Sequence, residues 1–295
     1  MYVWFWIIGW FLTVLAVTGN ALVIWLVTTK RRLRTTANFF IVSLATADFC
    51  VGLFLFPALF TCKRWPTYCT AYHRRVILAH LGFFVHASTA NLCAMTADRY
   101  IAVALPLRYI AFMTPQRSIR MIATAWVFPA VAWITYTVLV HYRDGSTSVV
   151  VVNIAMKCLF QILPTVLVTM ATIHMLIIVR RHKKEISSLL ADLRFNNCAS
   201  EKRPSRVRRS PEASSTKVVG VVVLTFVLCY SVENYFSFCK NCPTILVDAV
   251  LLLLVLNAAA NPLAYAFLKK DIKGEVHTVL RSARKKGLGQ SRAKT

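Results

Sequence analysis

The sequence predicts an all-α membrane protein, a bundle of seven transmembrane helices followed by a short amphipathic helix. Apolar residues fill 57% of the 295 positions, which is high for a soluble domain. Seven stretches reach the length of about 20 mostly apolar residues that a membrane-spanning helix needs. Their connections are short, so they form one compact bundle. The expected segments are Tyr2–Thr29, Thr36–Phe60, Val76–Leu105, Met121–Val140, Val149–Val179, Lys217–Phe236 and Thr244–Leu268.

Basic residues mark alternate ends of these segments and predict the orientation. The net charge is +24, and most of it lies after segments one, three, five and seven, beginning at Lys30, Arg108, Arg180 and Lys269. Loops rich in Lys and Arg stay cytoplasmic. We therefore expect a multi-pass plasma-membrane protein with its amino terminus outside and its carboxyl terminus in the cytoplasm. Topology and attraction to anionic lipid account for the charge, so no nucleic acid partner is expected.

The chain divides into three parts. The bundle covers residues 1–268, an amphipathic cytoplasmic helix covers 269–284, and a basic tail covers 285–295. Within Lys269–Ser282 the apolar residues Ile272, Val276, Val279 and Leu280 share one helical face, and basic residues occupy the rest. This pattern is typical of a helix that lies in the membrane interface and contacts lipid.

Two polar motifs occur at positions where a membrane helix normally excludes them. Asp98-Arg99-Tyr100 ends the third segment, and Asn261-Pro262 with Tyr265 lies near the end of the seventh. Charged groups within membrane segments are costly and persist where they pair, coordinate ions or switch. The two motifs together, each on its own segment, indicate a signalling receptor.

These motifs resemble those of the rhodopsin-like, or class A, G-protein-coupled receptor family, and the resemblance covers nearly the whole chain. It is carried by Gly19-Asn20, Asn38 to Asp48, Ser88, Asp98-Arg99-Tyr100, Trp126, Pro164, Glu212, Phe226, Cys229, Asn257 and Asn261-Pro262 to Tyr265. The resemblance implies a receptor that binds a small extracellular ligand and activates a heterotrimeric G protein. Arrestin and receptor kinases are further partners that it implies. No catalytic residue or enzymatic activity is expected.

The resemblance also assigns a switch. Arg99 would pair with Glu212 at the start of the sixth segment and would be released for the G protein when that segment moves outward. Tyr265 would then move inward. Pro164 and Phe226 would belong to a packing relay below the ligand. The alternative is that Arg99 and Glu212 are surface charges at helix ends, where ion pairs contribute little.

A sodium ion is the one bound cation expected. Asp48 is a carboxylate near the middle of the membrane and needs a cation, a proton or several hydrogen-bond donors. In the family fold Ser88, Asn257 and Asn261 would face it and form an oxygen-rich site that suits a hard cation. The alternative is a water-filled polar network without a stable ion.

Two disulfides are candidates in the outer loops. Cys62 and Cys69 can close the first loop, and Cys239 and Cys242 can close the third, as in several members of the family. The family's bond between helix 3 and the second outer loop is expected to be absent, because its helix-3 position is Arg74 and the loop has no cysteine.

The expected ligand region combines two unusual charges with apolar and polar neighbours. Leu81 takes the place of the aspartate that amine receptors use as a counter-ion. Lys157 and Glu233 lie deep in the outer half, where they either neutralise each other or clamp a polar ligand, with Glu233 binding a cation and Lys157 an anion. The further expected contacts are His80, Phe84, Tyr230 and Asn234.

Departures from the family pattern leave two other functions open. Tyr230 and Val232 replace the helix-6 tryptophan and proline, and Thr172 replaces a helix-5 tyrosine. A receptor fold that binds ligand without G-protein signalling is therefore one alternative. A transporter is the other, although no internal repeat of the kind many transporters show is present.

Overall fold

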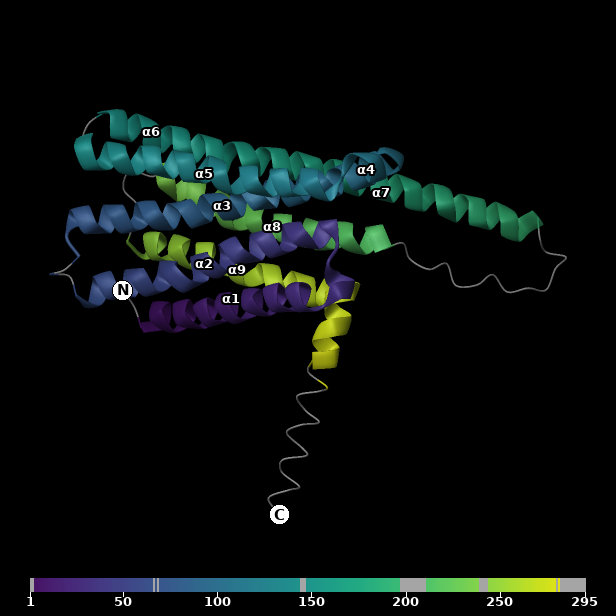
Figure 1. Cartoon of the computed structure of the whole chain (residues 1–295), viewed down its shortest axis with the longest axis horizontal. Coiled ribbons are helices and arrows are strands. Elements are labelled where there is room, and N and C mark those ends of the chain that lie inside the picture. The colour runs from purple at the N-terminus through teal and green to yellow at the C-terminus, as the bar shows by residue number, and fades with distance from the viewer. Residues whose placement is uncertain are drawn as a thin grey trace, which may run out of the picture.

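The computed structural model describes residues 3–65, 67, 69–143, 147–196, 211–238, 244–279 and 281, and long helices dominate this part of the chain (Figure 1). The elements are α1 (Val3–Thr29), η1 (Arg31–Leu33), α2 (Thr36–Arg64), α3 (Ala71–Ala104), α4 (Pro106–Phe112), α5 (Pro115–Arg143), α6 (Thr147–Lys157), η2 (Cys158–Ile162), α7 (Leu163–Asn196), α8 (Pro211–Phe238) and α9 (Thr244–Leu268). The long helices run beside one another. Residues 270–279 are also helical and turn away from the bundle.

The expected all-α bundle is confirmed. The helices α2, α3, α5 and α8 and the run from α6 through α7 extend beyond the expected segments, whereas α1 and α9 agree with them closely. Expected segment five corresponds to α6, η2 and α7 in sequence, with a π-helical turn at η2 that the sequence analysis did not foresee. The short elements η1 and α4 were also not predicted. Pro106 occupies the first turn of α4, where its missing N–H leaves no intrahelical bond unmade.

Six helical segments in the described chain are long and apolar enough to cross a membrane. They comprise α1, α2, α5, the run from α6 through α7, and the greater parts of α8 and α9. The remaining long helix, α3, carries His80, His86, Asp98 and Arg99. It packs against α2, α5, α7 and α8, so its polar side chains meet other helices.

The contact between α1 and α9 depends on a glycine. A Cβ atom added to Gly19 would lie 2.7 Å from Cγ of Pro262, closer than real Cβ contacts come. Beside it, the Asn20 side-chain amide donates to the carbonyl of Ala258 at 3.0 Å. The absence of a side chain at Gly19 thus allows α1 and α9 to approach closely, and the Asn20 amide forms a hydrogen bond between the two helices.

Hydrogen bonds between side chains join α2, α3 and α5. Ser43 donates to Oδ1 of Asn91 at 2.6 Å, and the Trp126 indole N–H donates to the Ser43 hydroxyl at 2.9 Å. Asn91 also donates to the carbonyl of Ala87 at 2.9 Å. Ser43 and Asn91 are buried, so these bonds satisfy groups that are costly to leave unpaired.

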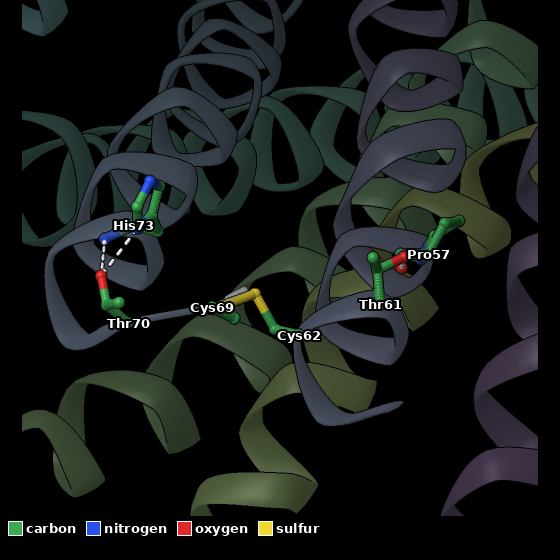
Figure 2. The surroundings of a disulfide bond; sticks show 6 residues. All are labelled: Pro57, Thr61, Cys62, Cys69, Thr70 and His73. Carbon is green, nitrogen blue, oxygen red and sulfur yellow. Dashed lines mark hydrogen bonds between the residues drawn. A yellow bond between two sulfur atoms is a disulfide. The ribbon is translucent and has the colours of Figure 1, made fainter. Parts of the chain in front are cut away.

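A disulfide connects the end of α2 with the segment before α3 (Figure 2). Cys62 and Cys69 form the bond across a separation of seven residues. Thr70 follows directly, and its hydroxyl accepts a hydrogen bond from the backbone N–H of His73 at 3.3 Å. A threonine that caps the first turn in this way fixes the start of α3. The disulfide at Cys69 and the helix cap at Thr70 therefore lie at adjacent residues.

Candidate functional site

The half of the bundle that is expected to face outwards contains a buried contact between an amide and a carboxylic side chain. Nε2 of Gln161 in η2 donates to Oε1 of Glu233 in α8 at 2.9 Å. Only 5% of Gln161 and 9% of Glu233 is exposed. The other side-chain oxygens, Oε1 of Gln161 and Oε2 of Glu233, are buried and have no hydrogen-bond partner in the described chain. Two acceptor atoms are therefore left without donors.

The π-helical turn places Gln161. Pro164 follows this turn and lacks a backbone N–H, so regular α-helical hydrogen bonding cannot continue through it. The hydroxyl of Thr165 donates to the carbonyl of Gln161 at 2.6 Å. The sequence thus disturbs the helix at η2 and turns Gln161 towards α8.

Two further polar atoms near these helices lack partners. The His86 ring of α3 stacks on Phe160 of η2, with ring centroids 4.8 Å apart, and its Nδ1 is buried without a hydrogen-bond partner. Oδ1 of Asn234, next to Glu233 in sequence, is also buried and unpaired within the described residues. Three elements, α3, η2 and α8, therefore carry polar atoms that the chain leaves unsatisfied.

Lys157 and Glu233 do not form an ion pair in the described chain. Lys157 is half-buried at the end of α6, and Glu233 hydrogen-bonds to Gln161 instead. The sequence left two interpretations open, an ion pair between Lys157 and Glu233 or a clamp for a polar ligand. The described residues do not contain that ion pair.

The other expected ligand contacts are spread over several interfaces. Leu81 is buried in the core, whereas Phe84 stacks on Phe54 of α2 with centroids 5.6 Å apart. His80 is exposed and packs edge-on against Trp133 of α5. The structure therefore places His80 and Phe84 on contacts with α5 and α2, and their ligand role remains a prediction.

Tyr230 packs against Phe226, a residue of the expected packing relay. Its ring is 2% exposed and lies 4.3 Å from the Phe226 ring, and its hydroxyl accepts a hydrogen bond from Thr89 at 3.4 Å. Tyr230 thus contacts α3 from α8. Pro164 is the second residue of α7, directly after η2.

Asp48 is fully buried in the middle of the bundle. The Ser88 hydroxyl donates to its Oδ1 at 2.6 Å, and the Asn261 amide donates to its Oδ2 at 2.6 Å. Oδ1 of Asn257 and Oδ1 of Asn261 are buried acceptors without partners in the described residues. A carboxylate, a hydroxyl and two amide oxygens form a donor set that fits a hard cation such as Na⁺.

Asp98, Arg99 and Tyr109 form a closed cluster at the opposite end of the bundle. Arg99 Nε donates to Asp98 Oδ2 at 2.7 Å, and Tyr109 donates to Asp98 Oδ1 at 2.9 Å. Arg99 Nη2 donates to the Tyr109 hydroxyl at 3.2 Å. Burial, followed by the Asp98 carboxylate, raises the pKa of Tyr109 to about 12. Tyr109 therefore stays protonated and continues to donate to Asp98.

Tyr100 and Tyr265 make different contacts. The Tyr100 hydroxyl lies 3.0 Å from Nδ1 of His174 in α7. The fully buried Tyr265 hydroxyl donates to the sulfur of Met95 in α3 at 3.9 Å. Glu212 lies in the first turn of α8, but its side chain is outside the described residues, as are Cys239 and Cys242.

Gln161 was not among the predicted site residues, and Lys269 lies in a different environment from the predicted one. Gln161 is a polar residue in an apolar run shortly before Pro164, and a polar residue at that position could have been predicted as a site residue. Lys269 was expected on the solvated face of the amphipathic helix, but it is 8% exposed and its ammonium donates to Asn38 Oδ1. Asn38 is 231 residues away in the sequence, so no local pattern indicates this contact.

A bundle of membrane-length helices, with a buried carboxylate at its centre and an Asp-Arg-Tyr cluster at one end, defines the class of transmembrane receptors. The chain matches the 7 transmembrane receptor (rhodopsin family) over residues 19–265. It belongs to that family. It is therefore a rhodopsin-like G-protein-coupled receptor, a multi-pass protein of the plasma membrane whose partners are a small ligand and a G protein.

Individual relatives agree with this assignment. The chain is 27% identical to adenosine receptor A2b of Bos taurus, over 91% of this chain and 87% of the relative. It is 25% identical to octopamine receptor beta-2R of Chilo suppressalis, over 92% and 78%. Identity to adenosine receptor A2a of Homo sapiens is 26%, over 92% and 70%. All are receptors, which agrees with the expectation of a protein without enzymatic activity.

Proposed function

We propose that this receptor binds a small extracellular ligand rich in N–H donors, with a positive charge, at the Gln161–Glu233 pair and transmits binding to a heterotrimeric G protein. The buried oxygens Oε1 of Gln161 and Oε2 of Glu233 carry the proposal, because both are acceptors that lack donors. A buried carboxylate needs a compensating charge or donor. A ligand ammonium or amidinium supplies both.

Neighbouring side chains support this ligand class. His86 and Asn234 bring further unpaired polar atoms, and Phe160 offers a ring face beside His86. Lys157, four residues before Gln161, would bind an acidic group on the same ligand. Leu81, His80, Phe84 and Tyr230 would provide the remaining contacts. The names of the octopamine and adenosine receptors are consistent with a small ligand that carries amino groups.

We further propose how binding reaches the cytoplasm. Tyr230 and Phe226 lie below Glu233 on the same helix, and Pro164 follows Gln161, so a ligand between these helices changes their spacing. The movement would release Arg99 from Asp98 and Tyr109, with Glu212 as a second partner in the resting receptor. Asn261, Pro262 and Tyr265 would adjust on α9. Receptor kinases and arrestin would bind the active cytoplasmic face.

Sodium and orientation complete the proposal. Na⁺ would be held by Asp48, Ser88, Asn257 and Asn261 and would stabilise the resting arrangement, because both asparagines belong to α9 while Ser88 belongs to α3. The basic loops support an amino terminus outside the cell and a carboxyl terminus in the cytoplasm.

The test is G-protein activation in cells, measured for octopamine, adenosine and a panel of small mono- and diamines. Glu233→Gln removes the charge, and Ser231→Ala changes an exposed neighbour on the same helix as the matched control. We expect Glu233→Gln to weaken the response to an active amine by at least about tenfold, with Ser231→Ala unchanged. Arg99→Ala should abolish signalling without abolishing amine binding. Binding without signalling in the unmodified receptor would favour the non-signalling alternative suggested by Tyr230, Val232 and Thr172.

A further inference from the structure

A buried lysine lies at the cytoplasmic end, directly after α9. The Lys269 side chain is 8% exposed, and its ammonium donates to Oδ1 of Asn38 near the start of α2. The Asn38 amide is already used, because it donates to the carbonyl of Leu33 at 2.7 Å. Within the described chain no carboxylate forms an ion pair with Lys269. A buried ammonium with a neutral partner is costly.

A small pocket lies against this ammonium. Its volume is about 10 Å³, the scale at which a cavity holds one water or one small ion. Two basic residues line it together with apolar ones, and none of its lining residues is acidic. The lining consists of Ala37, Ile41, Met95, Arg99, Val218, Val219 and Lys269.

The electrostatics of the pocket favour a negative occupant. Burial, and next the neighbouring Arg99, lower the pKa of Lys269 to about 8, although Asp271 and Asp98 oppose this shift. Lys269 is therefore still mainly protonated at neutral pH. Arg99 is bonded to Asp98 and Tyr109, so Lys269 is the cation whose charge is least compensated. Apolar walls strengthen any charge interaction inside the pocket.

We propose that this pocket binds a single small inorganic anion, chloride under cellular conditions, between Lys269 and Arg99. The small volume selects a monatomic ion over phosphate or an organic acid. Because Arg99 belongs to α3 and Lys269 follows α9, the bound ion joins the cytoplasmic ends of these two helices, and Val218 and Val219 of α8 form part of the apolar wall. The proposal does not depend on the extracellular ligand, on sodium or on G-protein coupling.

The test uses the purified full chain in nanodiscs of neutral phosphatidylcholine. Chloride is replaced by gluconate at constant sodium concentration and ionic strength. The two readouts are broadening of the ³⁵Cl resonance by the protein and the midpoint of thermal unfolding. Lys269→Met removes the buried charge, and Lys270→Met makes the same change at the exposed neighbour. Lys269→Gln keeps a donor for Asn38 and serves if the methionine variant does not fold.

We expect chloride to raise the unfolding midpoint of the unmodified receptor and of Lys270→Met by about 2–4 °C, because a ligand that binds only the folded state stabilises it. In Lys269→Met the shift and at least about two-thirds of the specific ³⁵Cl broadening should disappear. Equal chloride effects in all three proteins would overturn the proposal. Absence of any chloride effect in the unmodified receptor would do so as well, and would leave water in the pocket.

Discussion

Gln161 donates a hydrogen bond of 2.9 Å to Glu233 and thereby joins the π-helical turn η2 to α8 inside the membrane bundle. The residues are 72 positions apart, and both are buried. The Gln161 side-chain oxygen, Oε1, and the second carboxyl oxygen of Glu233, Oε2, have no donor in the described chain. The bond therefore fixes the position of the carboxylate while leaving acceptor capacity for another molecule.

Gln161→Leu is expected to destabilise the receptor by about 1–3 kcal/mol, because Glu233 loses its donor and stays buried. Thermal unfolding in nanodiscs without ligand measures the effect. Gln116→Leu, the same change at an exposed position of α5, should leave the unfolding midpoint nearly unchanged. Equal midpoints for the two variants would show that the Gln161 bond does not stabilise the fold.

Asp48→Asn is expected to abolish stabilisation by sodium. The measurement compares unfolding midpoints in NaCl and in choline chloride, which keeps the chloride concentration constant. The unmodified receptor should be more stable in NaCl, because the cation binds the folded state. Asp271→Asn changes an exposed aspartate after α9 and should retain the sodium effect. Persistence of that effect in Asp48→Asn would rule out this sodium site.

Tyr109→Phe is expected to raise basal nucleotide exchange on the G protein by roughly five- to tenfold. The variant loses the hydrogen bonds that connect Tyr109 with Asp98 and Arg99, and a loss of about 1 kcal/mol shifts a two-state equilibrium by that factor. Tyr142, which is 78% exposed, provides the matched control Tyr142→Phe. Basal exchange at or below the level of the unmodified receptor would contradict a restraining role for Tyr109.

The stability of the receptor is expected to rise with pH above about 8, provided that the medium contains gluconate instead of chloride. The pKa of Lys269 is about 8 in the folded state against 10.5 for an ordinary lysine. Between these values the unfolded chain binds more protons, so deprotonation favours the folded state. The full difference corresponds to roughly 3 kcal/mol.

Unfolding midpoints measured from pH 7 to 9.5 test this expectation. Lys269→Met should remove most of the rise, whereas Lys270→Met at the exposed neighbour should keep it. The prediction fails if the midpoint of the unmodified receptor falls over this range while that of Lys269→Met does not.

The helical segments and the family motifs are readable from sequence because each depends on a local pattern. Runs of about 20 apolar residues predict the spans, and Asp98-Arg99-Tyr100 is contiguous. The burial of Lys269 is different, because it depends on Asn38, 231 residues away. A lysine in an amphipathic stretch is ordinarily solvated, and only the packing of the end of α9 against α2 buries it.

Lys157 and Glu233 also differ from Gln161 in how far the sequence indicates them. Sequence analysis singled out Lys157 and Glu233 because charges are rare in such segments. Gln161, which donates a hydrogen bond to Glu233, was not predicted as a site residue because it is uncharged. The π-helical turn that orients Gln161 depends on the backbone hydrogen bonds around Pro164. The periodicity of an α-helix does not predict the additional residue that such a turn contains.

The close approach of Gly19 to Pro262 links the variation of two positions that lie far apart in the chain. Alanine at position 19 would place its Cβ 2.7 Å from the proline ring, so natural sequences of this receptor should keep glycine there for as long as position 262 is proline. A larger residue at position 19 would require a smaller residue at position 262. Receptor lineages that keep Pro262 should therefore keep Gly19 as well.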